Sequence, residues 1–385
     1  MTRTSGTTQA AGGSISRRSA LKAVAAVGAG VLASPAIVRQ ARSSSGQLNF
    51  MGWAGYDFKP AFADFTKTTG IKMNFIEQPE QDTFTAQAKL AKGQGLYDIC
   101  EPTADHVANW LEQDLIQPWN EKNIGLDNVT PALLEGAAAA LEVVGGKRYL
   151  TPSCWGTEAI TFNTQDAPQK YGECSLSVLW DPKYEGKVTV RPHSGLAALG
   201  RWLETQGKLP HPFLESYKDE KVMRANWDVI LKNAAQFKKD IGQFWKDENT
   251  AQGAFRANGC VVGQTWDSSA FQLKQDGVPV SYVSPKEGAF AWMQGMILFK
   301  DAKNVEQAEA FIKWLNTPKP SSMWGLAFTA NPCAKGSVEL LSDAVKAQYN
   351  GAFPADALSK LWWWPSQPTW YLGVRNEYAD KFQAS

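Results

Sequence analysis

Short apolar runs of strand type alternate with stretches of helical pattern along this chain, and this alternation restricts the fold more than any other feature. Residues 48–53 and 72–76 have strand character, and helical patterns follow them at 60–69 and 83–93. Such alternation is typical of α/β units on a largely parallel sheet. We therefore expect an α/β fold.

The alternation continues through the rest of the chain. A strand at 97–100 leads into a helix at 104–113, and a second series begins after Trp155. In that series we expect strands at 159–163, 188–190, 260–266, 279–283 and 295–299, and helices at 195–205, 227–239, 252–258, 271–275 and 305–316. The chain is longer than one hydrophobic core usually serves, so we expect two α/β lobes with a ligand cleft between them.

The amino terminus has the layout of a twin-arginine export signal. Arg17 and Arg18 precede an apolar run at 23–38 that is too short to span a bilayer, and small residues near Ala36 offer a peptidase site. We expect residues 1–41 to be removed and the mature chain to be periplasmic. No cysteine lies near this cleavage region to carry a lipid anchor.

Charge and cysteine content exclude several classes of protein. The predicted signal holds five of the 39 basic residues, so 34 basic side chains remain against 38 acidic ones, a net charge of −4. This balance argues against nucleic acid as a partner. The five cysteines form no CxxC or Cys/His cluster, which leaves no metal-ligand spacing and favours buried thiols over a disulfide framework.

Several segments resemble the spermidine/putrescine-binding proteins in the same order along the chain. They include Asn49-Phe50-Met51-Gly52-Trp53-Ala54-Gly55-Tyr56, Tyr97-Asp98-Ile99, Trp155-Gly156-Thr157-Glu158, Trp180-Asp181-Pro182-Lys183-Tyr184-Glu185-Gly186, and Pro285-Lys286-Glu287-Gly288 before Trp292. The resemblance covers nearly the whole mature chain. It implies a two-lobed periplasmic binding protein fold of type II, with a mixed sheet and flanking helices in each lobe.

The resemblance also implies the domain plan and the partners. Lobe 1 is expected at 46–154 and 291–363, and lobe 2 at 155–290 and 364–385. The chain is expected to be a monomer that captures a small-molecule solute and docks on the permease subunits of an ABC importer. Its ATPase is a separate subunit, and this chain has no GxxxxGK[ST] loop. No catalytic residue, metal or cofactor is expected.

The resemblance places an aromatic wall and a loop at the ligand. Trp53, Tyr56, Trp266 and Trp292 correspond to wall positions, and the loop carries Thr103, Ala104 and Asp105. Aromatic faces attract ammonium groups by roughly 0.5–2 kcal/mol, which suits a cationic ligand.

The departures from the resemblance change the expected ligand. Positions where polyamine binders carry acids fall here on His193, Leu196 and Gln294, and a polycation buried without counter-charges is strongly penalised. We therefore expect an anionic end of the solute near Arg191, His193 and Ser194, because an arginine fork suits carboxylate, sulfonate or phosphonate oxygens. Asp105 and Asp267 are candidates to pair an amine, which would make the solute zwitterionic.

Other readings stay open at this stage. Arg191 can instead face solvent or pair with a surface acid, His193 can be structural, and the tryptophans Trp155 and Trp364 can pack rather than line the cleft. The solute can be a polyamine after all, with Glu101, Asp105 and Asp267 as its acids. The chain can also present its solute to a receptor, or be an exported enzyme, although no GxSxG, HExxH or dinucleotide motif is present.

Overall fold

The computed structural model describes residues 46–135 and 139–385, so the predicted export signal lies outside the described residues. The first elements follow the predicted alternation: β1 (Gln47–Trp53), α1 (Lys59–Thr69), β2 (Lys72–Gln78), α2 (Gln81–Leu90), β3 (Ile99–Cys100) and α3 (Val107–Glu112). Pro60 stands in the first turn of α1 and Gly70 ends the helix in the left-handed conformation, and both residues are common at such places.

The remaining elements include short ones that the sequence pattern did not predict. The strands are β4 (Ile116–Gln117), β5 (Val143–Val144), β6 (Lys147–Arg148), β7 (Leu150–Asn163), β8 (Val188–Val190), β9 (Ile241–Phe244), β10 (Val262–Trp266), β11 (Val280–Val283), β12 (Phe290–Phe299), β13 (Asn331–Pro332) and β14 (Trp362–Trp363). The helices are α4 (Pro131–Glu135), α5 (Ala139–Glu142), α6 (Pro192–Thr205), α7 (Glu220–Phe237), α8 (Glu248–Arg256), α9 (Asp267–Gln275), α10 (Val305–Leu315), α11 (Pro318–Phe328), α12 (Asp343–Ala352) and α13 (Thr369–Ala384).

Several expected boundaries were wrong. Helix α6 begins at Pro192 rather than at residue 195, helix α7 begins at Glu220, and α9 begins directly after β10. Strand β12 starts five residues before the expected position, because its first half pairs with β7 and is mostly buried there. Strand β3 covers only the last two residues of the run expected at 97–100.

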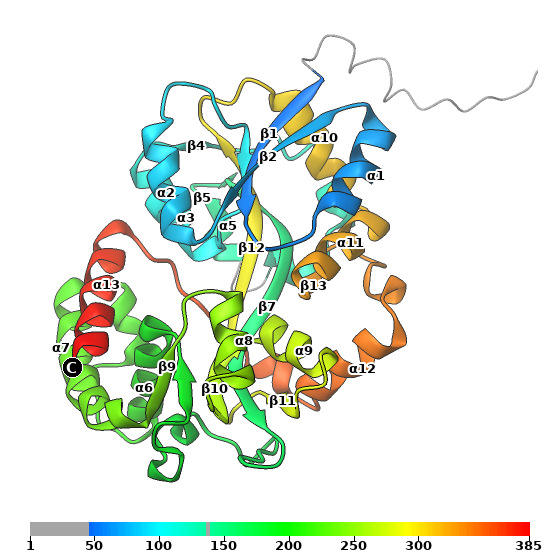
Figure 1. Ribbon diagram of the computed structural model, residues 1–385. Coiled ribbons are helices and arrows are strands. Elements are labelled where there is room, and N and C mark those ends of the chain that lie inside the picture. Colours follow the sequence, from blue (N-terminus) through cyan, green and yellow to red (C-terminus); the bar gives the residue numbers. More distant parts are fainter. Residues whose placement is uncertain (1–45, 136–138) are drawn as a thin grey trace, which may run out of the picture. The chain divides into compact units, whose positions relative to one another are not determined.

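One sheet runs through both halves of the chain in the order β2-β1-β3-β12-β7-β10-β8-β9. The antiparallel ladder between β7 and β12 forms its centre, from Phe290 opposite Glu158 to Ile297 opposite Leu150. Strands β1, β2 and β3 pair in parallel on one side of this ladder, and β8 pairs in parallel with both β9 and β10 on the other. Figure 1 shows β7 and β12 passing from one group of helices to the other.

Buried apolar side chains gather at the two ends of this ladder. The first core contains Phe50, Phe65, Phe311 and Trp324, together with the adjoining cluster around Trp110. The second core contains Val188, Leu199, Trp227, Tyr371 and Phe382. Helices α1, α10 and α11 therefore lie side by side although they are far apart in sequence (Figure 1).

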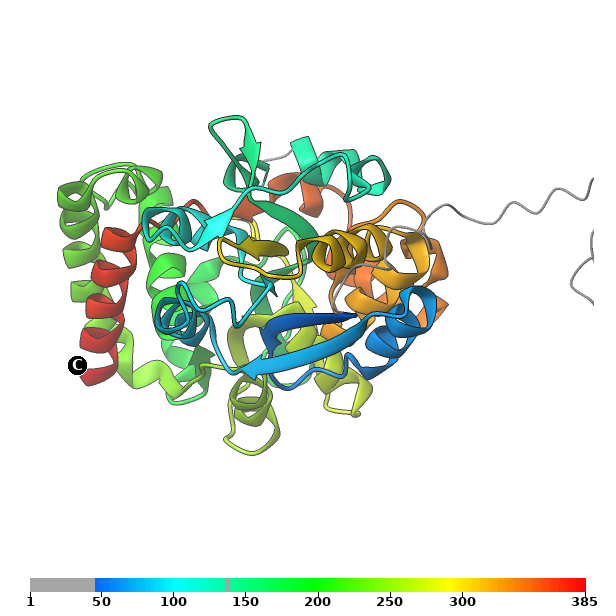
Figure 2. The same ribbon diagram turned by 90° about the horizontal axis from the view of Figure 1, so that it is seen from above.

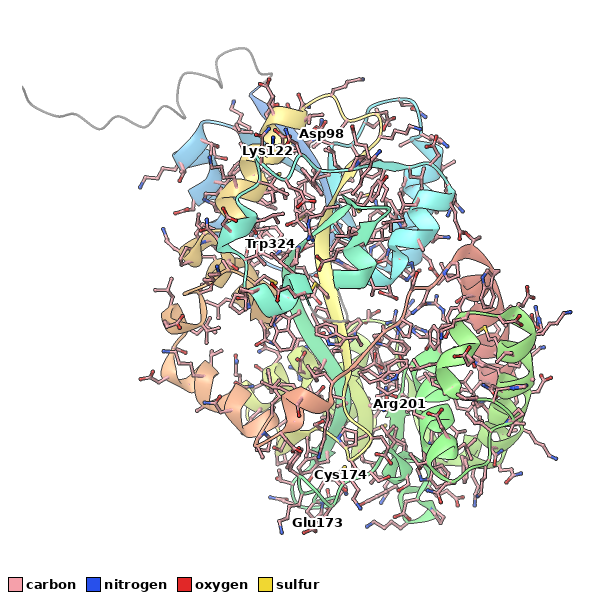
Figure 3. The ribbon with its side chains drawn as sticks, turned by 180° about the vertical axis from the view of Figure 1, so that it is seen from behind. Asp98, Lys122, Glu173, Cys174, Arg201 and Trp324 are labelled. Atoms are coloured by element: carbon pink, nitrogen blue, oxygen red, sulfur yellow. The ribbon has the colours of Figure 1, made fainter. Side chains whose placement is uncertain are left out.

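Asp98 joins distant parts of the first core. This fully buried carboxylate accepts hydrogen bonds from the backbone and side-chain amides of Asn49 and Asn304 and from the backbone N–H of Lys303. It therefore ties β1 to the start of α10, near the end of the molecule where Figure 3 labels it. A buried charge is tolerated where several donors surround it.

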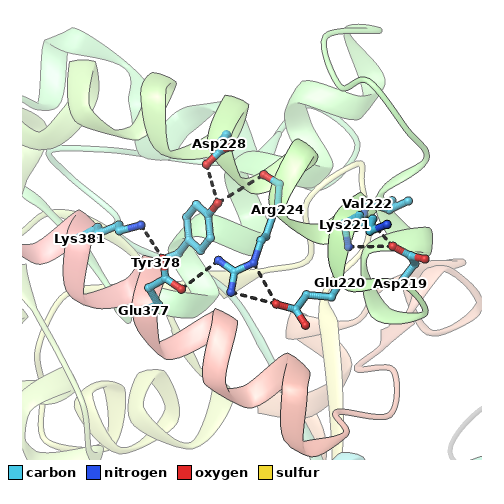
Figure 4. Close-up of polar contacts among 9 residues, drawn as sticks. All are labelled: Asp219, Glu220, Lys221, Val222, Arg224, Asp228, Glu377, Tyr378 and Lys381. Atoms are coloured by element: carbon cyan, nitrogen blue, oxygen red, sulfur yellow. Dashed lines mark hydrogen bonds and ion pairs between the residues drawn. The ribbon is translucent and has the colours of Figure 1, made fainter.

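The carboxyl-terminal helix α13 packs on α6 and α7 of the second core (Figure 2). Polar contacts on α7 and α13 accompany this packing: Arg224 bonds to Glu220 and Glu377, and the hydroxyl of Tyr378 donates to Asp228 (Figure 4). The sequence pattern did not predict α13. Its apolar residues Tyr371, Val374, Tyr378 and Phe382 are buried against the second core.

The described residues contain no helix long and apolar enough to cross a membrane. All five cysteines are buried and free, as predicted for small hydrophobic side chains.

A matched pair of glycine substitutions tests the packing of the sheet. A Cβ at Gly263 of β10 would lie 2.3 Å from the Cγ2 atom and 2.5 Å from the carbonyl oxygen of Thr189, whereas a Cβ at Gly253 of α8 meets nothing within 4 Å. We expect Gly263→Ala to destabilise the protein by about 1–3 kcal/mol. Gly253→Ala should stabilise it by about 0.5–1 kcal/mol, since alanine favours helix. Urea unfolding of both variants checks this, and equal effects would contradict the ladder between β8 and β10.

Candidate ligand-binding site

A cavity of about 490 Å³ lies where residues of both cores meet, a volume in the range of small-molecule sites. Its walls come from the ends of β1 and α11, the first half of β12 and the start of α2 on one side. On the other side are the start of α6, the ends of β9 and β10, and α13.

Nine of the eleven predicted site residues line this cavity. They are Trp53, Tyr56, Thr103, Asp105, Arg191, His193, Trp266, Trp292 and Gln294. These residues span more than 200 positions of the sequence, and the sheet brings them together because several stand at or beside strand ends. Their roles in binding remain predictions.

Ser194 and Asp267 are not among the cavity-lining residues. Ser194 is buried and donates its hydroxyl to Glu158 at 3.1 Å. Asp267 is fully buried at the start of α9 and accepts hydrogen bonds from the backbone N–H groups of Thr157 and Ser268 and from the Thr157 hydroxyl. The carboxylate of Asp267 is thus already occupied by protein donors.

Arg191 stands at the turn between β8 and α6, with Pro192 as the first residue of the helix. Its guanidinium carbon lies 5.5 Å from the ring centre of Trp266 and 5.7 Å from that of Trp245. Its guanidinium makes no hydrogen bond or ion pair with any residue of 46–135 or 139–385. Burial lowers the pKa of Arg191, while the carboxylate of Glu158 raises it. The alternative that Arg191 pairs with a surface acid is therefore wrong.

Glu158 of β7 faces the same part of the cavity. It is 1% exposed, and its Oε1 atom has no hydrogen-bond partner among the described residues. Burial raises the pKa of Glu158 to about 7, although the charge of Arg191 and the hydrogen bond from Ser194 lower it. Asp105 is also buried at the cavity, where burial raises its pKa and the side chain of Thr103 lowers it.

The aromatic wall is held in place by contacts with neighbouring residues. Trp53 donates its indole N–H to the carbonyl oxygen of Glu101 at 2.8 Å, and Tyr56 packs on Phe328 with ring centres 4.4 Å apart. Trp292 lies over Gly156, where a Cβ would come within 2.3 Å of the Trp292 ring. Gly156 is therefore needed for Trp292 to occupy this place.

Both histidines that line the cavity favour the neutral form of the imidazole. Burial lowers the pKa of His193 and of His106 well below the usual range, and the positive charges of Arg191 and Arg375 lower both further. His193 packs its ring edge against Trp364 at 6.3 Å between ring centres.

Sequence reasoning missed other residues that line the cavity. They include Glu158, Trp245, Phe328 and Arg375; Trp364, one of the two tryptophans left open, also lines it. Arg375 comes from α13 and bonds to Gln367 and Asn376. Glu158 lies inside the segment that carried the resemblance, so its position was a usable signal. Arg375 had no such signal.

Among residues 46–135 and 139–385, no group of three His, Cys, Asp or Glu side chains could hold a metal ion.

Comparison with known proteins places the chain among binding proteins. A family model described as bacterial extracellular solute-binding protein matches residues 60–354. The spermidine/putrescine-binding periplasmic protein of Escherichia coli (strain K12) is 27% identical over 281 residues, which cover 70% of this chain and 73% of that protein.

Solved structures confirm the predicted two-lobed α/β fold of periplasmic binding proteins. The spermidine/putrescine substrate-binding protein PotD of Streptococcus pneumoniae matches with a TM-score of 0.70 at 18% identity, covering 88% of this chain and 98% of that one. A structure described as a GABA receptor matches with a TM-score of 0.66 at 18% identity, covering 88% and 97% of the two chains.

Buried carboxyl groups around the cavity predict a loss of stability as pH rises. Burial raises the pKa of Glu101 to about 8, against the lowering effect of hydrogen bonds from Ser153 and Trp324, and burial raises that of Asp267 to about 7. The folded state thus holds protons that the unfolded chain releases near pH 4. This stabilisation is complete below about pH 4 and is lost progressively up to about pH 8.

The variant Glu101→Gln tests this linkage because glutamine imitates the protonated acid. We expect the fall in unfolding free energy between pH 5 and 8 to become shallower by up to about 1.4 kcal/mol per pH unit. Glu173→Gln is the control: Glu173 is exposed, and its hydrogen bond with Lys170 lowers its pKa, so it titrates below this window. Urea unfolding at several pH values measures the slopes. An unchanged slope in Glu101→Gln would show that Glu101 is ionised in the folded protein.

Proposed function

The chain belongs to the bacterial extracellular solute-binding protein family of non-enzymatic binding components of ABC importers, and we propose that its solute is a small zwitterion or organic anion. The observation that carries the proposal is Arg191. Its guanidinium lines the cavity, packs against two tryptophans and has no partner among the described residues. Arg191 is half-buried, and an unpaired cation that is partly removed from water is costly, so an anionic ligand group would remove that cost.

The start of α6 adds to the attraction for an anion. Helix amino termini carry partial positive charge, and α6 begins at Pro192, directly after Arg191. His193, on the first turn of this helix, lines the cavity as well. These observations therefore support Arg191 and His193 as parts of the predicted anion site. Ser194 contributes only indirectly, by its hydrogen bond to Glu158.

The position of the acids argues against a polyamine. Of the three acids considered as replacements for the missing anchors, Glu101 and Asp267 do not line the cavity and are bonded to protein donors. Asp105 alone lines it. A diamine would bring only positive charge into a cavity that Arg191 also lines, and it would leave the guanidinium of Arg191 without a partner. The GABA receptor of the same fold is an example of a zwitterion as the named ligand.

The remaining parts of the proposal follow the family. We propose that residues 46–154 with 291–363, and 155–290 with 364–385, act as lobes that close on the solute, as is usual in this fold. The relatives are periplasmic proteins, and export through the twin-arginine signal at 1–41 would bring this chain to the same place. There it would deliver its solute as a monomer to the permease subunits, with hydrolysis on a separate ATPase.

A thermal-shift screen followed by one substitution tests the proposed solute class. The screen covers polyamines, betaines, amino acids, aminophosphonates, aminosulfonates and simple organic acids, since a bound solute raises the melting temperature by mass action. For the compound found, Arg191→Ala should weaken binding at least about 100-fold, roughly 2.7 kcal/mol, because the buried anion loses its partner. Calorimetric titration measures both proteins.

Arg224→Ala is the matched control, because Arg224 makes ion pairs on α7 outside the cavity. It should leave the dissociation constant within about twofold. If only putrescine or spermidine raises the melting temperature, or if Arg191→Ala binds as tightly as the parent, the proposed solute class is wrong.

A further inference from the structure

Glu158 is placed to face the cavity by the pairing of its strand. It stands directly opposite Trp266 of β10 and Phe290 of β12, and directly paired residues in antiparallel strands share one face of the sheet. Trp292, opposite Gly156, is on that face too. The carboxyl group of Glu158 accepts a hydrogen bond from Ser194 on its Oε2 atom, and its Oε1 atom is left without a partner among the described residues.

Glu158 and Arg191 are neighbours that do not pair with each other. Arg191 lies against Trp266, the residue directly opposite Glu158 in the ladder, and their charges influence each other. No ion pair within 4.0 Å joins them, although both line the cavity. Glu158 is buried and Arg191 is half-buried, and each side chain lacks partners. Two such groups of opposite charge are complementary to a ligand that carries the two opposite charges close together.

The other acids near the cavity do not offer the same partner. Glu80, Asp82 and Asp380 line it but are exposed to solvent. Asp267 is occupied by Thr157 and Ser268, and Glu248 accepts from Gln252 and Ser268; neither lines the cavity. Asp105 lines it, but its carboxylate lies 3.7 Å from the His106 ring and close to the charge of Arg375. Glu158 is therefore the acid best placed to meet a ligand group next to Arg191.

We infer that Glu158 binds the ammonium group of the solute while Arg191 binds its acid group, so that the solute is an amino acid with both groups on the same or neighbouring carbons. This inference rests on the proposed function and specifies its head group. The rest of the solute then points away from Glu158 and Arg191, toward Trp53, Tyr56 and Phe328 at the far wall. Those rings suit an apolar or aromatic side chain.

Four compounds with four-carbon chains test the inference on the unaltered protein. Butyrate carries the acid alone, 2-aminobutyrate carries both groups on one end, 4-aminobutyrate separates them, and 1,4-diaminobutane carries two amines. Calorimetric titration should give at least tenfold tighter binding for 2-aminobutyrate than for any of the other three. Leucine and phenylalanine, which keep the head group and enlarge the side chain, should bind as well or better.

Two variants then assign the ammonium site. Glu158→Gln keeps the shape of the side chain and removes its charge. It should weaken the binding of 2-aminobutyrate at least tenfold and leave the dissociation constant for butyrate within twofold. Glu248→Gln is the control, because that carboxyl group is close to the aromatic wall without lining the cavity, and it should change neither value. Melting temperatures of the ligand-free variants show whether each has folded.

The outcomes separate this inference from the proposed function. If 4-aminobutyrate or butyrate binds as tightly as 2-aminobutyrate or more tightly, the head-group inference is overturned. The proposed solute class, a zwitterion or an organic anion, then still stands. Binding of 1,4-diaminobutane alone overturns both. The role given to Glu158 is overturned if 2-aminobutyrate, leucine and phenylalanine all fail to bind. It is also overturned if Glu158→Gln loses affinity for 2-aminobutyrate and butyrate equally.

Discussion

The ladder between β7 and β12 is the constraint on which the rest of the molecule depends. Strand β7 has 14 residues, and its first residues are buried in the first core while Ile160 and Phe162 are buried in the second. A one-residue slip in its pairing would turn every side chain to the other face of the sheet. Both cores resist such a slip, and the same register sets Gly156 under Trp292 and Glu158 beside Trp266.

At the cavity, burial disfavours the charged forms of the side chains that line it. Glu158 is buried and Arg191 is half-buried at the cavity, and neither side chain finds a full set of partners among the described residues. Isolated buried charges cost several kcal/mol, which hydrophobic packing elsewhere must offset. A ligand that satisfies both groups recovers this energy on binding. The two large apolar cores supply the stability that makes such a site possible.

The alternation of strands and helices could be predicted from sequence because it depends on local patterns of apolar residues. Resemblance to a known family then brought together Trp53, Arg191 and Trp292, which the structure places on one cavity. The role of Asp267 could not be judged in this way, because its hydrogen bonds to Thr157 depend on the pairing of distant strands. Arg375 was missed because helix α13 owes its position to packing on α6 and α7.

The same scaffold can serve different solutes because shape and charge come from different parts of the cavity. The rings of Trp53 and Trp292 stand on β1 and β12, whose positions the first core and the central ladder determine, so an aromatic wall persists whatever the ligand. The polar and charged groups stand at turns and at single strand positions, such as Arg191 after β8 and Gln294 at the irregular step of β12. A substitution there changes which ionic groups are matched without disturbing either core. Under the proposed function, the sign of the charge opposite the aromatic wall, rather than the wall itself, therefore decides which solute is bound.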